Sequence, residues 1–202
     1  MTEDATVSLK FVLLGQEGVG KTTIIRKFCL NEQCKSEYNP TIGMDIYTKT
    51  IILGKILDII VDDINVNLNI YDVNGKVCDS RNLPNLLSNS DALIFVYDVN
   101  HVGSFESLKN WIKAAQDCAY SSLMVLVGHK IDLLRNISID DQIIASKDYQ
   151  LVFNTEASSS ELINTAFVRI ASEILTKQED SIVIFKIINI RWLYLKFHKI
   201  RE

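Results

Sequence analysis

The sequence lacks the features that would set it apart from ordinary soluble proteins. Its 21 basic and 25 acidic residues leave a formal net charge of −4 over 202 residues. That balance gives no indication of nucleic acid as a partner. The opening residues 1–4 are polar and acidic, unlike a signal peptide, and Thr2 stands where N-myristoylation requires glycine.

Paired cysteines, repeats and linkers are missing as well. The four cysteines (Cys29, Cys34, Cys78 and Cys118) show no C-x-x-C spacing, which favours reduced cytosolic thiols over disulfides. No repeat or linker divides residues 1–177, and the length suits one domain with a full core. We therefore expect one domain over residues 1–177 and a tail of different composition over residues 178–202.

The strongest motif that is present runs from Gly15 to Thr22 and reads G-x-x-x-x-G-K-T. A hydrophobic run precedes it as an expected strand, and a helix-compatible segment follows it. Glycines let backbone N–H groups turn inward around a polyphosphate, and the helix N-terminus adds its positive dipole end. Lys21 would reach the β- and γ-phosphates, and the Thr22 hydroxyl would ligate Mg²⁺. The phosphate-binding candidates are Gly15, Gln16, Glu17, Gly18, Val19, Gly20, Lys21, Thr22 and Thr23.

Hydrophobic patterning predicts an α/β fold, and the phosphate-loop motif makes it one of the P-loop NTPase type. The sheet would be six-stranded and mostly parallel, with one antiparallel edge strand from an early hairpin and helices on both faces. The expected strands are residues 9–14, 41–51, 65–72, 92–97, 123–127 and 151–153. The expected helices are residues 22–28, residues 104–115 with Ser104 as the cap, and residues 161–177.

Two further motifs follow predicted strands. Asp72 and Gly75 form D-x-x-G, in which the carboxylate can hold Mg²⁺ through water and the glycine N–H can meet a γ-phosphate. Next to a later strand stand His129, Lys130 and Asp132. A carboxylate there can accept hydrogen bonds from N1 and N2 of guanine, which adenine cannot supply, and a lysine stem can cover the base.

In this order the motifs resemble those of the Ras superfamily of small GTPases, over about residues 7–177. Residues 40–45 and 93–99, with Ser104, Phe105 and Trp111, look most like the Rab branch. The resemblance implies a switch that binds GTP or GDP with Mg²⁺ and acts in vesicle trafficking. Thr41 would be the switch threonine, which ligates Mg²⁺ only when a γ-phosphate is present. Further nucleotide contacts would come from Tyr38, Gly75, His129, Lys130, Asp132, Ala157 and Ser158, and metal contacts from Thr22, Thr41 and, through water, Asp72.

The resemblance also implies two partner-facing segments, Pro40 to Asp45 and Gly75 to Ser90, which would contact effectors and regulators. Two residues depart from the family at the hydrolytic centre. Lys76 replaces the glutamine that orients the attacking water, and Glu17 puts a carboxylate where the family has glycine or serine. Since water positioning and an arginine finger supply most of the acceleration, the finger alone about 10³–10⁵, we expect slow hydrolysis.

Guanine binding is altered too. His129 replaces the family's asparagine, Cys34 replaces the aromatic that stacks on the base, and Ser158 replaces the lysine of the last base loop. Each loss costs on the order of 1 kcal/mol, so we expect weaker affinity and faster exchange, with ATP still excluded by Asp132. Two alternatives stay open: a non-hydrolysing pseudo-GTPase scaffold, and a P-loop small-molecule kinase, for which no arginine-rich lid is found.

The tail differs from the rest of the chain. Residues 181–199 are mostly apolar but are interrupted by Lys186 and Arg191, too soon for a membrane span. The last cysteine is Cys118, so prenylation is not expected. The tail is either an interfacial segment on anionic lipid or an artefact of the gene model. The expected location is cytoplasmic, with peripheral contact to endomembranes.

Overall fold

A six-stranded sheet forms the centre of the protein. The computed structural model describes residues 6–32, 41–53, 64–76, 81–116, 119, 121–133 and 149–178. The strand order is β2-β3-β1-β4-β5-β6. The strands are β1 (Thr6–Leu14), β2 (Met44–Leu53), β3 (Ile64–Val73), β4 (Ala92–Asp98), β5 (Leu123–His129) and β6 (Leu151–Asn154). Neighbouring strands are parallel except β2 and β3, which are antiparallel, so the predicted fold with its antiparallel edge strand is confirmed.

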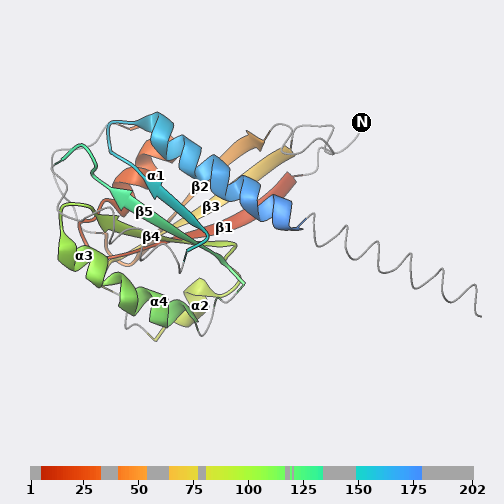
Figure 1. Ribbon diagram of the computed structural model, residues 1–202. Helices are drawn as coiled ribbons and strands as arrows, with labels where there is room; N and C mark the ends of the chain where they lie inside the picture. The colour runs from red at the N-terminus through yellow and green to blue at the C-terminus, as the bar shows by residue number, and fades with distance from the viewer. Residues whose placement is uncertain are drawn as a thin grey trace, which may run out of the picture.

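Helices cover both faces of the sheet (Figure 1). They are α1 (Lys21–Leu30), α2 (Leu83–Leu87), α3 (Val102–Glu106), α4 (Leu108–Gln116) and an unlabelled helical stretch over residues 160–178. Helix α1 and residues 160–178 lie on one face, and α2, α3 and α4 lie on the other. Each face has its own buried core. Phe28 of α1 stacks on Phe167 at 4.1 Å between ring centroids, while Phe95 and Trp111 belong to the second core.

Strand β3 shows how the sequence pattern sets the sheet. Its alternating apolar residues Val66, Leu68 and Ile70 are fully buried. The intervening asparagines bond to β2, where the Thr50 hydroxyl donates to Asn67 Oδ1 at 2.6 Å and Thr48 donates to Asn69 Oδ1 at 3.2 Å. The predicted early hairpin, with one antiparallel strand at the sheet edge, is confirmed.

The predicted helix cap at Ser104 is wrong. The segment holds two short helices, α3 and α4, and the residue before the first is His101. Ser104 lies inside α3 and is fully buried, where its hydroxyl accepts a bond from Asp98 N at 3.0 Å and donates to His101 O at 2.7 Å. The hydroxyl therefore fastens α3 to the end of β4 instead of capping a single long helix.

Several sequence-based expectations lie outside the described residues. They concern the connection over residues 54–63, the segment containing Cys34, Tyr38 and Pro40, residues 77–80, and the tail beyond residue 178. In the described part, no helix is long and apolar enough to cross a membrane.

Candidate nucleotide and metal site

The loop between β1 and α1 is shaped by glycines. Gly15 has φ +140°, and a Cβ atom there would lie 2.1 Å from the Val96 carbonyl oxygen on β4. Gly20 has φ +104°, and its Cβ would lie 2.4 Å from Cδ2 of His129. Both positions therefore exclude a side chain by contact as well as by backbone angle. The loop can pass directly over the ends of the strands only because these residues are glycine.

Lys21 points back into this loop. Its ammonium donates to the carbonyl oxygens of Gly15 and Gln16, at 2.7 and 2.9 Å. Burial lowers the pKa of Lys21 to about 8, although the charges of Asp72 and Glu17 act in the opposite direction. The loop thus holds a desolvated cation in its concavity, which is the arrangement that attracts a phosphate group.

Three oxygen-bearing side chains meet at the start of α1. The Thr22 hydroxyl donates to Asp72 Oδ2 at 2.5 Å and lies 3.0 Å from the Thr41 hydroxyl. The Thr41 hydroxyl in turn lies 3.5 Å from the same carboxylate oxygen. These residues come from α1, the end of β3 and the segment before β2. The sequence-predicted metal residues are therefore brought together.

The residues at this point fit a magnesium ion. Asp72 is fully buried, and its second oxygen, Oδ1, makes no hydrogen bond within the described residues. Burial raises the pKa of Asp72, against the hydrogen bond from Thr22 and the charge of Lys21. The described residues hold no cluster of three or more His, Cys, Asp or Glu side chains. One carboxylate with two hydroxyls still suits Mg²⁺, because this ion takes few protein ligands and completes its shell with water and phosphate oxygens.

Lys130, which follows β5, contacts the phosphate loop between β1 and α1. Lys130 has φ +65°, and its ammonium donates to Gly18 O at 2.9 Å and to Asp98 Oδ2 at 2.8 Å. Burial acts to raise the pKa of Asp98, but the bonds from Lys130 and Asn100 outweigh it and the pKa is lowered. Lys130 therefore links β4, β5 and the phosphate loop.

His129 is a buried brace and does not project toward solvent. It is 1% exposed, its Nδ1 lies 2.9 Å from the Thr155 hydroxyl, and its ring faces Gly20. Burial is the main cause that lowers the pKa of His129 to about 4. The ring thus joins the phosphate loop to the loop after β6, in its neutral form near pH 7.

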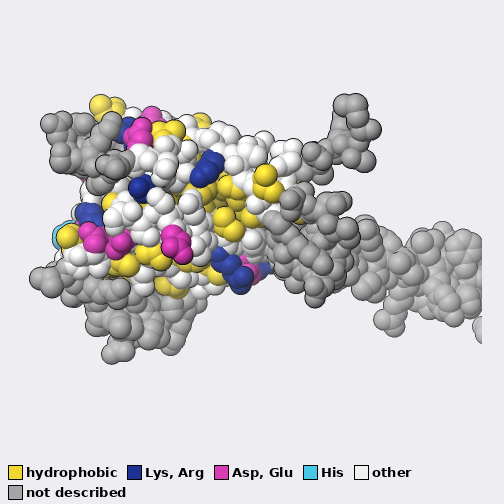
Figure 2. Space-filling model, turned by 90° about the horizontal axis from the view of Figure 1, so that it is seen from above, with side chains coloured by type: hydrophobic (Ala, Val, Ile, Leu, Met, Phe, Trp, Pro, Cys, Tyr) yellow, Lys and Arg dark blue, Asp and Glu magenta, His cyan; other side chains and the backbone are white. Residues whose placement is uncertain are grey.

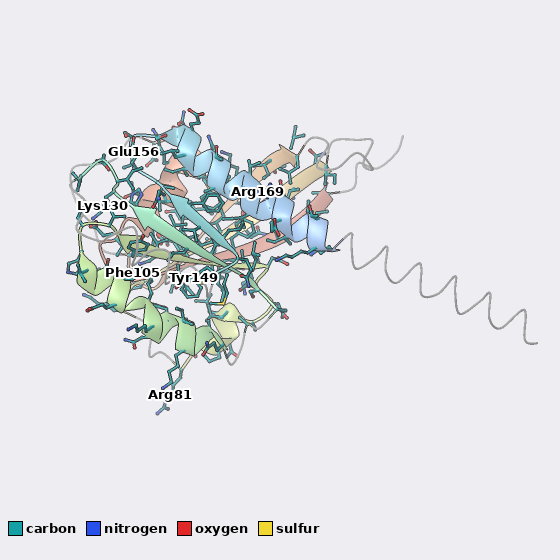
Figure 3. All side chains as sticks on the ribbon, in the orientation of Figure 1. Arg81, Phe105, Lys130, Tyr149, Glu156 and Arg169 are labelled. Atoms are coloured by element: carbon teal, nitrogen blue, oxygen red, sulfur yellow. The ribbon has the colours of Figure 1, made fainter. Side chains whose placement is uncertain are left out.

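The loop after β6 lies beside these residues. Thr155 N donates to Gly128 O at 2.8 Å, and Ile131 N donates to Thr155 O at 3.4 Å. Figure 3 shows Lys130 and Glu156 at the same end of the molecule. Asp132 is exposed, Ala157 is partly exposed, and the Ser158 hydroxyl donates to Glu156 Oε1 at 2.7 Å. The two candidate base-binding segments are thus neighbours at the carboxyl ends of the parallel strands, where open α/β sheets bind ligands.

The structure joins two residues that the sequence presented as separate departures. Lys76 Nζ lies 2.9 Å from Glu17 Oε2, with side chains 70% and 28% exposed. Gly75 makes this possible, because a Cβ atom there would lie 2.1 Å from Glu17 N. The segment after β3 is therefore packed directly on the phosphate loop. Their opposite charges were the only sequence signal for this pair, and nothing in the spacing indicated contact.

One residue of this region was missed altogether. Asn74 stands inside the D-x-x-G motif, where only the first and last positions were assigned roles, yet its side chain bonds to the segment before β2. Of the predicted site residues, Tyr38 lies outside the described part of the chain. The others are at or next to one end of the sheet, spread over the loops after β1, β3, β5 and β6 and the segment before β2.

A family comparison agrees with this geometry. The chain matches the model of the Ras family over residues 10–176, which is most of its length and includes every motif described above. Members of this family bind guanine nucleotides, generally with Mg²⁺, and interact with effectors and regulators. The chain therefore belongs to the Ras family and is a small GTPase of the GTP-binding switch type.

Proposed function

We propose that this chain is a Rab-type switch that binds GTP and GDP with Mg²⁺, hydrolyses GTP slowly, and acts in vesicle trafficking on the cytoplasmic side of endomembranes. The observation that carries the slow hydrolysis is the ion pair between Glu17 and Lys76. The Rab assignment rests on the resemblance of residues 40–45 and 93–99.

Nucleotide binding would use the residues of the described loops in distinct roles. Lys21 would exchange its loop carbonyl partners for phosphate oxygens, and Thr22 with Asp72 would hold Mg²⁺, which neutralises phosphate charge. The exposed Asp132 carboxylate would accept hydrogen bonds from guanine. His129 would support the nucleotide-binding loops and not contact the nucleotide, because its ring lies against Thr155 and Gly20. Tyr38, Ala157 and Ser158 would complete the contacts.

Slow hydrolysis follows from where Lys76 is held. An ammonium group has three donors and no acceptor, so it cannot take up the proton of an attacking water. Its partner Glu17 lies on the phosphate loop, and the pair places a carboxylate where a partner's arginine would have to approach. A carboxylate beside the terminal phosphate also adds like charge. The same pair favours the second candidate function, a scaffold of this fold that binds nucleotide without hydrolysing it.

The test uses the purified full chain in two steps. Calorimetric titration with GTP, GDP and ATP in Mg²⁺ should give binding for the guanine nucleotides alone. Single-turnover hydrolysis should then be slow, and Lys76→Gln should raise the rate. Lys109→Gln, an exposed residue on α4, is the matched control and should leave the rate unchanged. No hydrolysis in either the parent or Lys76→Gln would favour the scaffold, and binding of ATP would contradict the role of Asp132.

Partner contacts would involve the exposed apolar residues before and within β2. Ile42 is 92% exposed, and Met44 and Ile46 are also exposed. These residues, with the segment from Gly75 to Ser90 that contains α2, are the proposed surface for effectors and regulators. The tail, residues 178–202, would supply membrane contact without prenylation. Deletion of the tail should abolish flotation with anionic liposomes, and unchanged flotation would end that part of the proposal.

A further inference from the structure

Asn74, the residue directly after β3, bonds to the segment that carries Thr41. Its backbone N–H donates to Gly43 O at 3.1 Å, and its side-chain Nδ2 donates to Thr41 O at 2.6 Å. Its Oδ1 accepts the backbone N–H of Lys76 at 2.8 Å. We call these three hydrogen bonds the Asn74 latch. It joins the segment before β2 to the segment after β3.

The latch prolongs the β2–β3 ladder past its regular end. The last residue pair of that ladder is Met44 with Val73. The Asn74 backbone N–H adds one bond beyond that pair, to Gly43 O. The side-chain amide of Asn74 then donates to Thr41 O, in place of a further backbone donor. Strand β2 is at the sheet edge, so its end is paired on one side only. Without the side-chain bond, Thr41 would have no ladder partner and the edge would open more easily.

The latch fixes the position of Thr41. With its carbonyl held, the Thr41 hydroxyl lies 3.0 Å from the Thr22 hydroxyl and 3.5 Å from Asp72 Oδ2. Every bond in the latch joins two groups of the protein itself, and none of the three has a phosphate oxygen or a metal ion as its partner. The other end of the same amide holds Lys76, whose ammonium pairs with Glu17. One side chain therefore connects the metal site with the hydrolytic centre.

We propose that Asn74 is a positioning residue that holds residues 41–43 closed over the metal site with GDP as well as with GTP. Its consequence is a switch whose first switch segment differs little between the two nucleotide states. This deepens the proposed function and rests on it. An effector that contacts only residues 41–45 would then discriminate weakly between the two forms, and discrimination would depend on the segment after Lys76.

The test is amide hydrogen exchange, resolved by residue with NMR, on the full chain loaded with Mg²⁺ and either GDP or a non-hydrolysable GTP analogue. In the parent protein, the exchange rates of the Asn74 amide in the GDP and analogue forms should agree within about threefold. In the GDP form, Asn74→Ala should speed amide exchange at residues 43–44 and 74 by about three- to tenfold, the factor equivalent to one hydrogen bond. The analogue form should change less, because Mg²⁺ and the γ-phosphate then hold Thr41. A residue that merely stabilised the fold would change both forms equally.

Asn74→Asp separates the two ends of the side chain and serves if the alanine variant does not fold. It lacks the donor to Thr41 O but keeps an acceptor for Lys76 N, so exchange should rise at Asn74's neighbours in residues 41–44 while the Lys76 amide stays protected. Asn110→Ala, at an exposed position on α4, is the control and should change nothing at the site.

Two results would overturn the latch. One is identical exchange of parent and Asn74→Ala in the GDP form. The other is a parent protein in which residues 43–44 exchange far more than about tenfold faster with GDP than with the analogue. Failure of the proposed function is distinct, because it shows at the loading step as absence of bound guanine nucleotide. The exchange comparison on unloaded protein then still decides whether Asn74 holds residues 41–43.

Discussion

At the scale of single residues, Glu17 and Lys76 account for one another. The carboxylate of Glu17, on the phosphate loop, would be unfavourable beside bound phosphate. The ammonium of Lys76, after β3, pairs with it at 2.9 Å. Lys76 is largely exposed and Glu17 partly so, and such a pair contributes only about 0–1 kcal/mol to stability. The pair therefore acts mainly on the position of Lys76 and on the charge of Glu17 at the site. It keeps Lys76 against the loop and leaves Glu17 partly neutralised.

His129 gives a prediction with a defined direction. Burial lowers the pKa of His129 to about 4, with the charge of Lys130 acting in the same sense and Asp132 and Asp98 acting against it. In the unfolded chain a histidine side chain has a pKa of about 6.5. Between pH 6.5 and pH 4 the unfolded state therefore binds more protons than the folded state, and stability falls as pH falls. The contribution of His129 amounts to a loss of about 2 kcal/mol from pH 7 to pH 5.

Urea unfolding of the parent and of His129→Asn at both pH values measures this contribution. The variant should lose less stability than the parent on acidification, by about 2 kcal/mol. His101→Asn is the matched control, because His101 is exposed and its side chain makes no capping bond. Equal pH dependence in the parent and His129→Asn would show that the ring is not held neutral by burial.

The sequence indicated residues that the structure brings together, but not how they pair. The motifs identified Thr22, Thr41 and Asp72, and the structure brings their oxygens within 3.5 Å of one another. The pairing of Glu17 with Lys76 and the bonds of Asn74 were not predicted. Both depend on how closely the loop after β3 packs on the phosphate loop, and that distance is set by Gly75 and by tertiary structure.

At the scale of secondary structure, the strands were the predictable part. Long apolar runs and the alternation in β3 report burial directly, so all six strands were found with ends shifted by a few residues. Helix boundaries were less accessible. The periodicity over residues 104–115 indicated one helix, whereas α3 ends at Glu106 and α4 begins at Leu108. The break follows from side-chain bonds of Ser104 to the end of β4, which periodicity does not report.

Helix α2 was not predicted, and the structure explains how so short a helix is held. With five residues it is too short to persist alone. The Lys10 ammonium, on β1, donates to Leu86 O at 2.7 Å and to Ser88 O at 2.8 Å, and it lies 5.1 Å from the centroid of the Tyr71 ring. Burial lowers the pKa of Lys10, while the charge of Asp91 opposes the shift. A cation on the central sheet thus satisfies the free carbonyls at the helix C-terminus.

Lys10→Met should therefore loosen α2 while keeping the apolar stem packed. Exchange of the Leu86 and Ser88 amides, which bond to Asn82 O and Pro84 O, should become several-fold faster. The free energy of unfolding should fall by about 1.5–3 kcal/mol, the range for a hydrogen bond that involves a charged group. Lys109→Met on α4 is the control. Unchanged exchange at both amides would mean that packing of Leu83 and Leu87, which are buried, holds the helix by itself.

At the scale of the whole molecule, the net charge is small, and on one face the charged side chains are dispersed. Figure 2 shows basic and acidic side chains interspersed on the face covered by α1 and residues 160–178, with no field of one sign over the described residues in view. This agrees with the small net charge of −4. The face in view therefore offers no basic patch for a nucleotide, whereas the phosphate loop holds the buried ammonium of Lys21.

The folded chain bears a cost at that site which a bound ion would offset. Asp72 is fully buried, and its Oδ1 has no hydrogen-bond partner within the described residues. A buried polar atom left without a partner costs about 1–3 kcal/mol, and more for a charged group. In Asp72→Asn the atom at the Oδ1 position still lacks a partner, but it belongs to a neutral group, and the amide nitrogen at the Oδ2 position can donate to the hydroxyls of Thr22 and Thr41. The variant should thus be at least as stable as the parent when no nucleotide is bound.

Thermal unfolding separates the two effects of Asp72→Asn. In EDTA without nucleotide, the variant should melt at or above the parent's Tm, by about 2–4 °C for each kcal/mol relieved. With saturating Mg²⁺ and GDP the order should reverse, because a ligand stabilises in proportion to its affinity and the variant lacks the carboxylate that would hold the ion. A lower Tm for the variant in EDTA would show that the bonds to Asp72 stabilise the fold itself. An equal gain from Mg²⁺ and GDP in both proteins would show that Asp72 holds no metal, because the whole ligand-linked difference between them rests on that one carboxylate.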